Sequence, residues 1–382
     1  MSLQKKTVGI VVTIAAVIVL GIISYSAWQR SAWDNEAVVA VVSSLTGDLA
    51  ANGKDTANGA AMALEEAIAK GLSRGRKIKV ELFDDQGDPK TAVSVANRIC
   101  QDKRIVAVVG HLTSGCMSAA APVYAREGMP VVMPVPTNPA ITKSGHKNLY
   151  RVPPTDDDQA PFLARYLLSK DPKAPVAVVS DLTAYGVGFA TAFKDTFQGG
   201  GGSVVAFEGA QKDTRDFRSL IGTLKEKGAE YVVLGATYDM GAPFTRQMKE
   251  LGLQATVFSG DGCYGAAFLE QAGNAAEGTV VSFIAPDKAA SPATEKFFQE
   301  YERKYGRVVS FAPLGYDAGQ VVAEAIRRAN SLDRQGILAA IRSADFSVEG
   351  VTGRIQFDEN GDNKNKNLVL YVVQGGKWVL LK

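Results

Sequence analysis

The segment GHLTSGCMSAA, residues 110–120, brings a histidine, two hydroxyl groups and a thiol together directly after the strand-like run RIVAVVG. These residue types could form a nucleophile with its base, a phosphate-binding loop, or a cup for another anion. A nucleophile site is poorly supported, because Ser114 lies outside a G-x-S-x-G elbow and no carboxylate is evidently placed to orient His111. The segment also lacks G-x-x-x-x-G-K-[ST] and G-x-G-x-x-G, so it does not match the usual phosphate-binding loops.

The anion cup fits the segment better than the other two interpretations. A strand is expected to end at Gly110 and a helix to begin near Ser114, so the first N–H groups of that helix would have no internal partner. Together with the helix dipole and a serine hydroxyl group, these N–H groups favour a carboxylate. A purely structural alternative is that Ser114 only caps the helix.

Two later segments place polar groups where a ligand could meet them. VPTNPAIT carries Thr137 after the next strand, and FSGDG places Asp261 between glycines at the end of a strand. Because open α/β sheets bind ligands at the carboxyl ends of their strands, Thr137 should emerge at the same sheet edge as Ser114. Asp261 could receive an ammonium group, or it could stabilise its own turn. An anion cup on one lobe and an acid on another would together suit a zwitterion.

The elements that position these residues alternate between strand and helix. AVVAVVSS has the apolar run of a buried strand, and GKDTANGAAMALEEAIAKG has apolar residues at helical spacing and ends on glycine. A second, similar series follows, then two helical segments and a β-rich tail with a hairpin turn at QGG. This alternation predicts parallel sheets with crossover helices, and 382 residues are too many for one simple core. We therefore expect an α/β protein with two similar lobes.

The N-terminal segment has the pattern of an export or anchoring signal. Lys5 and Lys6 precede 22 uncharged residues, 7–28, which as a helix would span about 33 Å and could cross a bilayer. The positive flank predicts that the chain starts inside and that its body lies outside. Cleavage near Ala27, as in a signal peptide, is the competing interpretation. Both interpretations predict an exported body.

Composition argues against several classes of function. The 42 basic and 40 acidic residues give a net charge of +2, so no basic surface for nucleic acid is indicated. Two histidines and three cysteines show no metal-ligand spacing, and neither a metal nor a cofactor is expected. Cys100, Cys116 and Cys263 are predicted to be small buried thiols.

Several stretches resemble, in the same order, the branched-chain amino acid (leucine/isoleucine/valine) binding proteins of ABC importers. They include DDQGDPKTAVSVANRI, GHLTSG, MPVPTNPAIT, DLTAYGVG and GYDAGQ. The resemblance implies the periplasmic binding protein type I fold, in which two Rossmann-like lobes with parallel sheets are joined by three crossings. It also implies these boundaries: 1–35 signal peptide or membrane anchor, 36–155 and 285–350 lobe one, 156–284 and 351–382 lobe two.

The same resemblance implies roles for individual residues. Ser114 would hold a ligand carboxylate, and Asp261 its ammonium group, with help from Thr137 and the backbone around Pro136. The aromatic residues implied to line the site are Tyr185 and Tyr238 on the opposing lobe and Tyr316 at the side-chain end of the pocket. Asn52 stands where the family has an aromatic residue against an aliphatic ligand, so this chain departs from the pattern there.

These features predict a receptor rather than an enzyme, with no catalytic residue. It would bind an α-amino acid, aliphatic or branched-chain by resemblance, and deliver it to an ABC permease from the periplasm or the outer face of the cytoplasmic membrane. Two alternatives keep the binding fold: a membrane-tethered amino-acid sensor if the N-terminal segment is uncleaved, and an importer receptor for an amide or urea-like solute.

Overall fold

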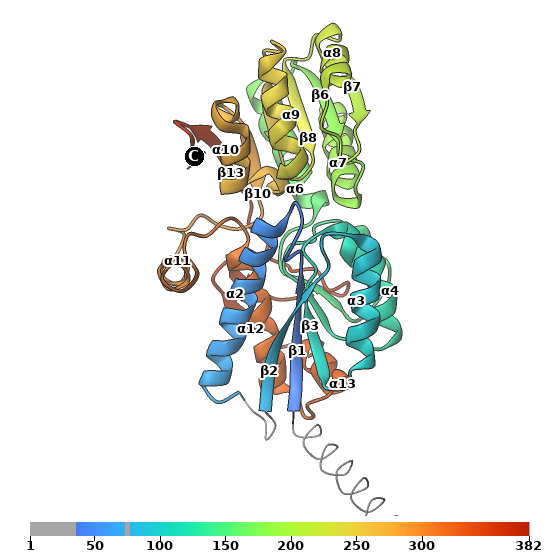
Figure 1. The fold of residues 1–382 in the computed structure, drawn as a ribbon, viewed down its shortest axis with the longest axis vertical. Coiled ribbons are helices and arrows are strands. Elements are labelled where there is room, and N and C mark those ends of the chain that lie inside the picture. Colours follow the sequence, from blue (N-terminus) through green and yellow to red (C-terminus); the bar gives the residue numbers. More distant parts are fainter. Residues whose placement is uncertain (1–35, 73–76, 382) are drawn as a thin grey trace, which may run out of the picture.

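The computed structural model describes residues 36–72 and 77–381, and it divides them between two sheets (Figure 1). The first sheet is entirely parallel and has the order β2-β1-β3-β4-β5. Its strands are β1 (Glu36–Ser43), β2 (Lys77–Asp84), β3 (Ile105–Val109), β4 (Val131–Met133) and β5 (Leu149–Arg151). Helices cover both faces, which is why β1 and β3 are almost continuously apolar.

Successive residues of β1 point into two different cores. Val39 packs with Leu64 and Leu314 on one face, whereas Val38 packs with Met117 on the other. The helices of this lobe are α2 (Ala50–Ala69), α3 (Pro89–Gln101), α4 (Ser114–Arg126), α5 (Ala140–Lys143), α11 (Pro292–Tyr305), α12 (Ala312–Arg328) and α13 (Arg334–Ile341). In Figure 1, α3 and α4 lie on one side of the strands, and α2 and α12 lie on the other.

Helices α2 and α12 approach each other so closely that glycine is required at their contact. A Cβ atom on Gly59 would lie 2.1 Å from the carbonyl oxygen of Ala312, and one on Gly315 would lie 2.1 Å from that of Thr56. Asp55 strengthens the junction, since its buried carboxylate accepts hydrogen bonds from the N–H groups of Ser310 and Ala312, each at 2.9 Å. This contact ties the late helix α12 to the first lobe.

The second sheet has the order β14-β13-β10-β9-β8-β6-β7. Its parallel strands are β6 (Pro175–Ser180), β7 (Ser203–Gly209), β8 (Tyr231–Gly235), β9 (Thr256–Ser259) and β10 (Val280–Phe283). The antiparallel strands β13 (Val369–Gln374) and β14 (Lys377–Leu380) join through Gly375 and Gly376, both at positive φ, as a two-residue hairpin turn requires. The hairpin predicted at QGG is therefore confirmed.

Helices also flank this second sheet. They are α6 (Asp156–Lys170), α7 (Ala184–Gly199), α8 (Arg218–Glu226), α9 (Tyr238–Glu250) and α10 (Ala266–Ala272), with the 3-10 turns η1 (Asp261–Cys263) and η2 (Gly273–Ala276). Phe189 of α7 and Leu163 of α6 fill one core, and Phe244 of α9 fills the other. The predicted α/β class with two parallel-sheet lobes is confirmed.

The chain passes between the lobes after β5, after β10 and before β13. The last passage comes later than the boundary expected at residue 351. The hairpin β11 (Val348–Gly350) and β12 (Gly353–Ile355) and the following loop stay with lobe one, where Asp362 forms a bridge with Arg151 and Asn363 donates to the carbonyl of Val152. Residues 351–363 thus belong structurally to lobe one.

Two further expectations concern the N-terminal segment and the three cysteines. The proposed signal peptide or anchor, 1–35, lies outside the described residues. Among the residues that the structure describes, no helix is long and apolar enough to cross a membrane. Cys100, Cys116 and Cys263 are buried free thiols, as expected, and burial raises the pKa of Cys116 and of Cys263 to about 12.

Candidate ligand-binding site

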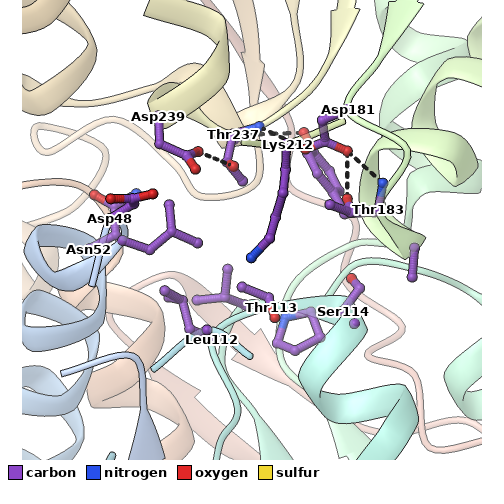
Figure 2. Close-up of a pocket in the computed structure, with 18 of the residues that line it drawn as sticks. Asp48, Asn52, Leu112, Thr113, Ser114, Asp181, Thr183, Lys212, Thr237 and Asp239 are labelled. Atoms are coloured by element: carbon purple, nitrogen blue, oxygen red, sulfur yellow. Dashed lines mark hydrogen bonds between the residues drawn. The ribbon is translucent and has the colours of Figure 1, made fainter. Parts of the chain in front are cut away.

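A cavity of about 590 Å³ lies between the lobes, at the carboxyl ends of both parallel sheets (Figure 2). Lobe one contributes the loops after β1, β2, β3 and β4, and lobe two contributes the loops after β6, β7, β8 and β9. This is the edge at which parallel α/β sheets generally bind ligands. Of the predicted site residues, the cavity is lined by Ser114, Pro136, Thr137, Tyr185 and Asp261.

Ser114 is the first residue of α4, and Thr113, rather than Ser114, caps that helix. The Thr113 hydroxyl accepts a hydrogen bond from the N–H group of Cys116 at 3.2 Å. The Ser114 hydroxyl accepts from the N–H group of Asn138 at 3.3 Å, which leaves its own proton available to a ligand. The N-terminus of α4 thus faces the cavity with Ser114 and Gly115 in its lining. This geometry suits a carboxylate.

His111 does not act on Ser114. The imidazole is fully buried, with Nδ1 2.7 Å from Asp85 Oδ2 and Nε2 3.1 Å from the Tyr124 hydroxyl. Asp85 also accepts from the Ser44 hydroxyl at 3.0 Å. Both ring nitrogens are therefore occupied by structural contacts, so the histidine–serine pair considered from the sequence is not a nucleophile with its base.

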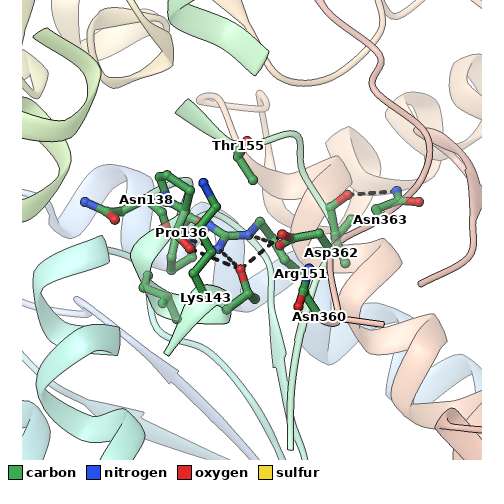
Figure 3. A network of polar contacts seen from close by, with 12 residues as sticks. Pro136, Asn138, Lys143, Arg151, Thr155, Asn360, Asp362 and Asn363 are labelled. Atoms are coloured by element: carbon green, nitrogen blue, oxygen red, sulfur yellow. Dashed lines mark hydrogen bonds and ion pairs between the residues drawn. The ribbon is translucent and has the colours of Figure 1, made fainter. Parts of the chain in front are cut away.

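The loop that carries Pro136 and Thr137 is held from behind by a buried arginine (Figure 3). Arg151 donates to the carbonyl oxygens of Pro136 at 2.7 Å and Asn138 at 2.9 Å, and its Nε lies 2.8 Å from Asp362 Oδ1. The Thr137 carbonyl accepts from the N–H group of Asp156 at 2.9 Å. The carbonyls expected to help hold an ammonium group are thus already engaged within the protein.

Asp261 opens the 3-10 turn η1 after β9 and is only 3% exposed. The Tyr185 hydroxyl lies 3.4 Å from its Oδ1 and accepts from the Gly262 N–H group at 3.2 Å. A Cβ atom on Gly260 would lie 2.5 Å from that hydroxyl, so glycine is needed beside Asp261. Burial raises the pKa of Asp261 to about 7, although hydrogen bonding with Gln159 and Tyr185 opposes the shift.

A second buried acid, Asp156, lies close to this group and was not anticipated. It is the first residue of α6, is fully buried, and neither of its carboxylate oxygens has a hydrogen-bond partner among the described residues. Burial raises its pKa well above the usual value, and the charge of Asp261 adds to the effect. Gln159 Oε1 is also buried without a partner. The charge of Arg151 lowers the pKa of Asp156, but Arg151 forms its ion pair with Asp362, so these acceptors behind the cavity form no ion pair among the described residues.

Two of the predicted tyrosines lie outside the cavity lining. Tyr238, at the start of α9, is buried, and its hydroxyl donates across the lobes to the carbonyl of Asp48 at 2.6 Å. Tyr316 lies on α12, where its hydroxyl donates to Glu66 Oε2 at 2.9 Å and its ring packs on Phe297. Tyr316 faces a separate depression beside α2, so the expected place at the side-chain end of the pocket is corrected.

Polar residues that sequence reasoning did not single out complete the cavity. Asp181 accepts from Thr183 and Thr237, and Asp239 accepts from the Thr237 hydroxyl at 2.5 Å (Figure 2). Lys212, in the loop after β7, also lines the cavity. Such loop residues carry no periodic pattern that would identify them. Among the described residues, no cluster of three or more histidine, cysteine or acidic groups could hold a metal ion.

A two-lobed α/β fold with a cleft between sheet edges, a helix N-terminus on one side and a buried acid on the other defines a solute-binding protein. The profile of the family described as periplasmic binding protein matches residues 36–377, and this chain belongs to that family. It is 33% identical over 341 residues to the Leu/Ile/Val-binding protein BraC3 of Rhizobium johnstonii, covering 89% of this chain and 92% of BraC3.

Further relatives agree in fold and in sequence. The leucine-, isoleucine-, valine-, threonine-, and alanine-binding protein of Pseudomonas aeruginosa is 31% identical, with 87% of this chain and 88% of that protein covered. Among solved structures, the leucine binding protein LivK of Thermotoga maritima is similar with a TM-score of 0.83 at 28% identity, covering 91% of this chain and 98% of LivK. LivJ of Streptococcus pneumoniae, in complex with isoleucine, also has a TM-score of 0.83, at 26% identity, covering 90% and 97%.

Proposed function

We propose that this protein is an extracytoplasmic receptor that captures an α-amino acid between its lobes and delivers it to an ABC importer. The observation that carries the proposal is the placement of Ser114 and Asp261 in one cavity, on opposite lobes. The names of the relatives, which bind leucine, isoleucine and valine, support the same class of ligand.

The two charged ends of the ligand would be held by different lobes. The carboxylate would accept from the Ser114 hydroxyl and from free N–H groups at the start of α4 on lobe one. The ammonium group would donate to Asp261 on lobe two, since the carbonyls of Pro136 and Thr137 already accept from Arg151 and Asp156. A ligand with both charges therefore links the lobes, which stabilises the closed form.

Contacts between the lobes support such a closed form. The Tyr238 hydroxyl bonds to the Asp48 carbonyl at 2.6 Å, and Asn138 Nδ2 donates to the Ala184 carbonyl at 2.6 Å. Both contacts join an element of one lobe to an element of the other. An importer that recognises the closed shape would thereby distinguish loaded from empty receptor.

Calorimetric titration of the body, residues 35–382, against the twenty amino acids, urea and simple amides tests the proposal. We expect binding of at least one amino acid, and a loss of at least about tenfold in affinity for Ser114→Ala and for Asp261→Asn. Asp195→Asn, an exposed acid on α7, is the matched control and should bind normally. Binding of an amide or urea, with Asp261→Asn unaffected, would favour an amide-type solute and overturn the proposed ammonium site.

A further inference from the structure

One end of the cavity is more polar than an aliphatic side chain needs. Asn52, on α2, lines the cavity and is only 3% exposed, yet its Oδ1 has no hydrogen-bond partner among the described residues. A buried carbonyl oxygen without a donor is costly, because it has lost its hydrogen bond to water and gained none in return. In a binding cavity, such a group indicates that the ligand supplies the missing hydrogen bond.

Lys212 adds a positive charge from the opposite lobe. Figure 2 shows its side chain reaching from the loop after β7 into the cavity, with the ammonium end toward the side of Leu112 and Thr113. Within the described part of the chain, no ion pair or hydrogen bond of its Nζ is found. The start of α4, which also carries partial positive charge, lies on this side of the cavity. Since the proposed function assigns the start of α4 to the α-carboxylate of the ligand, the Lys212 ammonium is left to donate to a second oxygen acceptor.

Among the described residues, no acid forms an ion pair with Lys212, although its charge contributes, after hydrogen bonds from Thr91, to the lowered pKa of Asp88 at the start of α3, and the acids that line the cavity have other partners. Asp48 pairs with Arg215 at 3.2 Å, and Asp239 accepts from the Thr237 hydroxyl. Asp181 accepts from the N–H group and the hydroxyl of Thr183 at 2.9 and 2.6 Å. Among the described residues that line the cavity, Lys212 is the one cationic side chain, and a ligand oxygen can accept from it directly.

Apolar side chains also line this cavity, alongside Asn52, Lys212 and the residues proposed to hold the zwitterion. Leu49, Leu112, Val135 and Phe311 line the cavity from lobe one. They can pack against the methylene groups of a side chain whose end is polar. A wholly aliphatic side chain would satisfy these walls and leave both Asn52 and Lys212 without a partner.

We propose that the cavity takes an α-amino acid whose side chain ends in a carboxamide, with Lys212 donating to the carboxamide oxygen and the carboxamide N–H donating to Asn52 Oδ1. The inference rests on the proposed function and specifies its ligand. Lys212 and Asn52 would act as specificity-determining residues, whereas Ser114 and Asp261 hold the part common to all amino acids. A carboxylate end could accept from Lys212 but has no donor for Asn52 Oδ1, so tighter binding of glutamate or aspartate than of glutamine and asparagine would overturn the inference.

The test compares glutamate, glutamine, aspartate and asparagine with leucine, isoleucine and valine by calorimetry on the body of the protein. For the wild-type protein we expect glutamine or asparagine to bind at least about tenfold more tightly than leucine. Lys212→Met should weaken that ligand by at least about tenfold while changing leucine by less than about threefold. Lys227→Met, an exposed lysine at the end of α8, is the matched control and should change neither.

Asn52→Leu provides the reverse test, because it converts the polar end into an apolar one. It should weaken the polar ligand and tighten leucine, so that the preference moves toward the aliphatic amino acids. Tighter leucine binding by the wild-type protein would overturn the inference and leave the proposed function intact. An equal loss for every amino acid in Lys212→Met would also overturn it, since Lys212 would then hold the common carboxylate. Binding of no amino acid at all would overturn both proposals.

Discussion

The carboxyl groups of Asp156 and Asp261 lie close together behind the cleft, both buried and neither in an ion pair among the described residues. Burial raises both pKa values, and the charge of Asp261 further raises that of Asp156. Two such acids titrate as a coupled pair. An incoming ammonium group would favour the ionised form of the pair, so binding and proton release should be linked.

Amino-acid binding should therefore strengthen as the pH rises. With the pKa of Asp261 raised to about 7, most of the ligand-free protein carries a proton there at pH 6. The proton must leave when the ammonium group binds, so affinity at pH 6 should be about tenfold lower than above pH 8. Titration across pH 5.5–8.5 measures this. Asp261→Asn should bind weakly with a flat profile; an equally steep profile in that variant would show that another group titrates.

Replacing Asp156 by asparagine should stabilise the ligand-free protein at neutral pH. The pKa of Asp156 is raised in the folded state. The stability that the protonated acid contributes is therefore complete below pH 3.8 and is lost as the pH rises through the folded-state pKa of Asp156. Asparagine removes this decline. The melting temperature of Asp156→Asn should therefore match that of the wild type near pH 4.5 and exceed it by a few degrees near pH 7.5.

The same experiment on Asp195→Asn, which changes an exposed carboxylate, should show no such pH-dependent gap. If Asp156→Asn melted below the wild type at neutral pH, the acid would have to be ionised and paired in the folded protein. That outcome would contradict the absence of partners around its oxygens.

Arg151 should be essential for the shape of the cleft although it does not line it. The guanidinium group is fully buried and holds the Pro136 and Asn138 carbonyls and the Asp362 carboxylate. Arg151→Met leaves those acceptors and a buried charge without their partner, so unfolding in denaturant should require about 3–5 kcal/mol less. The double variant Arg151→Met/Asp362→Asn should recover part of this loss. Arg218→Met, at an exposed ion pair, should leave the stability almost unchanged.

Much of the fold could be predicted because buried parallel strands appear as apolar runs and the helices between them carry apolar residues at helical spacing. β1 is buried along nearly its whole length, and the carboxyl ends of the neighbouring strands β3 and β4 meet at one edge, which brings Ser114 and Thr137 into one cavity; Asp261 reaches it from the edge of the second sheet. The placement of Tyr316 could not be derived in this way. Helix α12 is buried on almost every side, so periodicity does not reveal which face meets the cleft.

Contacts distant along the chain were equally inaccessible. The bridge between Arg151 and Asp362 joins residues 211 positions apart, and it keeps the tail on lobe one beyond the boundary expected at 351. Lys212 sits in a loop with no repeating pattern, and its relation to the cavity follows only from how the lobes are arranged. Sequence reasoning predicted the sheet edge at which the cavity lies, whereas the groups that reach the cavity from loops required the structure.

Loss of the Tyr238 hydroxyl should weaken ligand binding without removing any contact to the ligand. That hydroxyl joins lobe two to the Asp48 carbonyl on lobe one at 2.6 Å, a bond that exists only when the lobes are close. Tyr238→Phe should therefore release ligand about two- to tenfold faster, as expected for one hydrogen bond, with little change in the association rate. Stopped-flow kinetics would measure both rates. Tyr166→Phe, whose ring packs on Phe258 within lobe two, is the control. Unchanged release by Tyr238→Phe would mean that this contact does not contribute to holding the lobes closed.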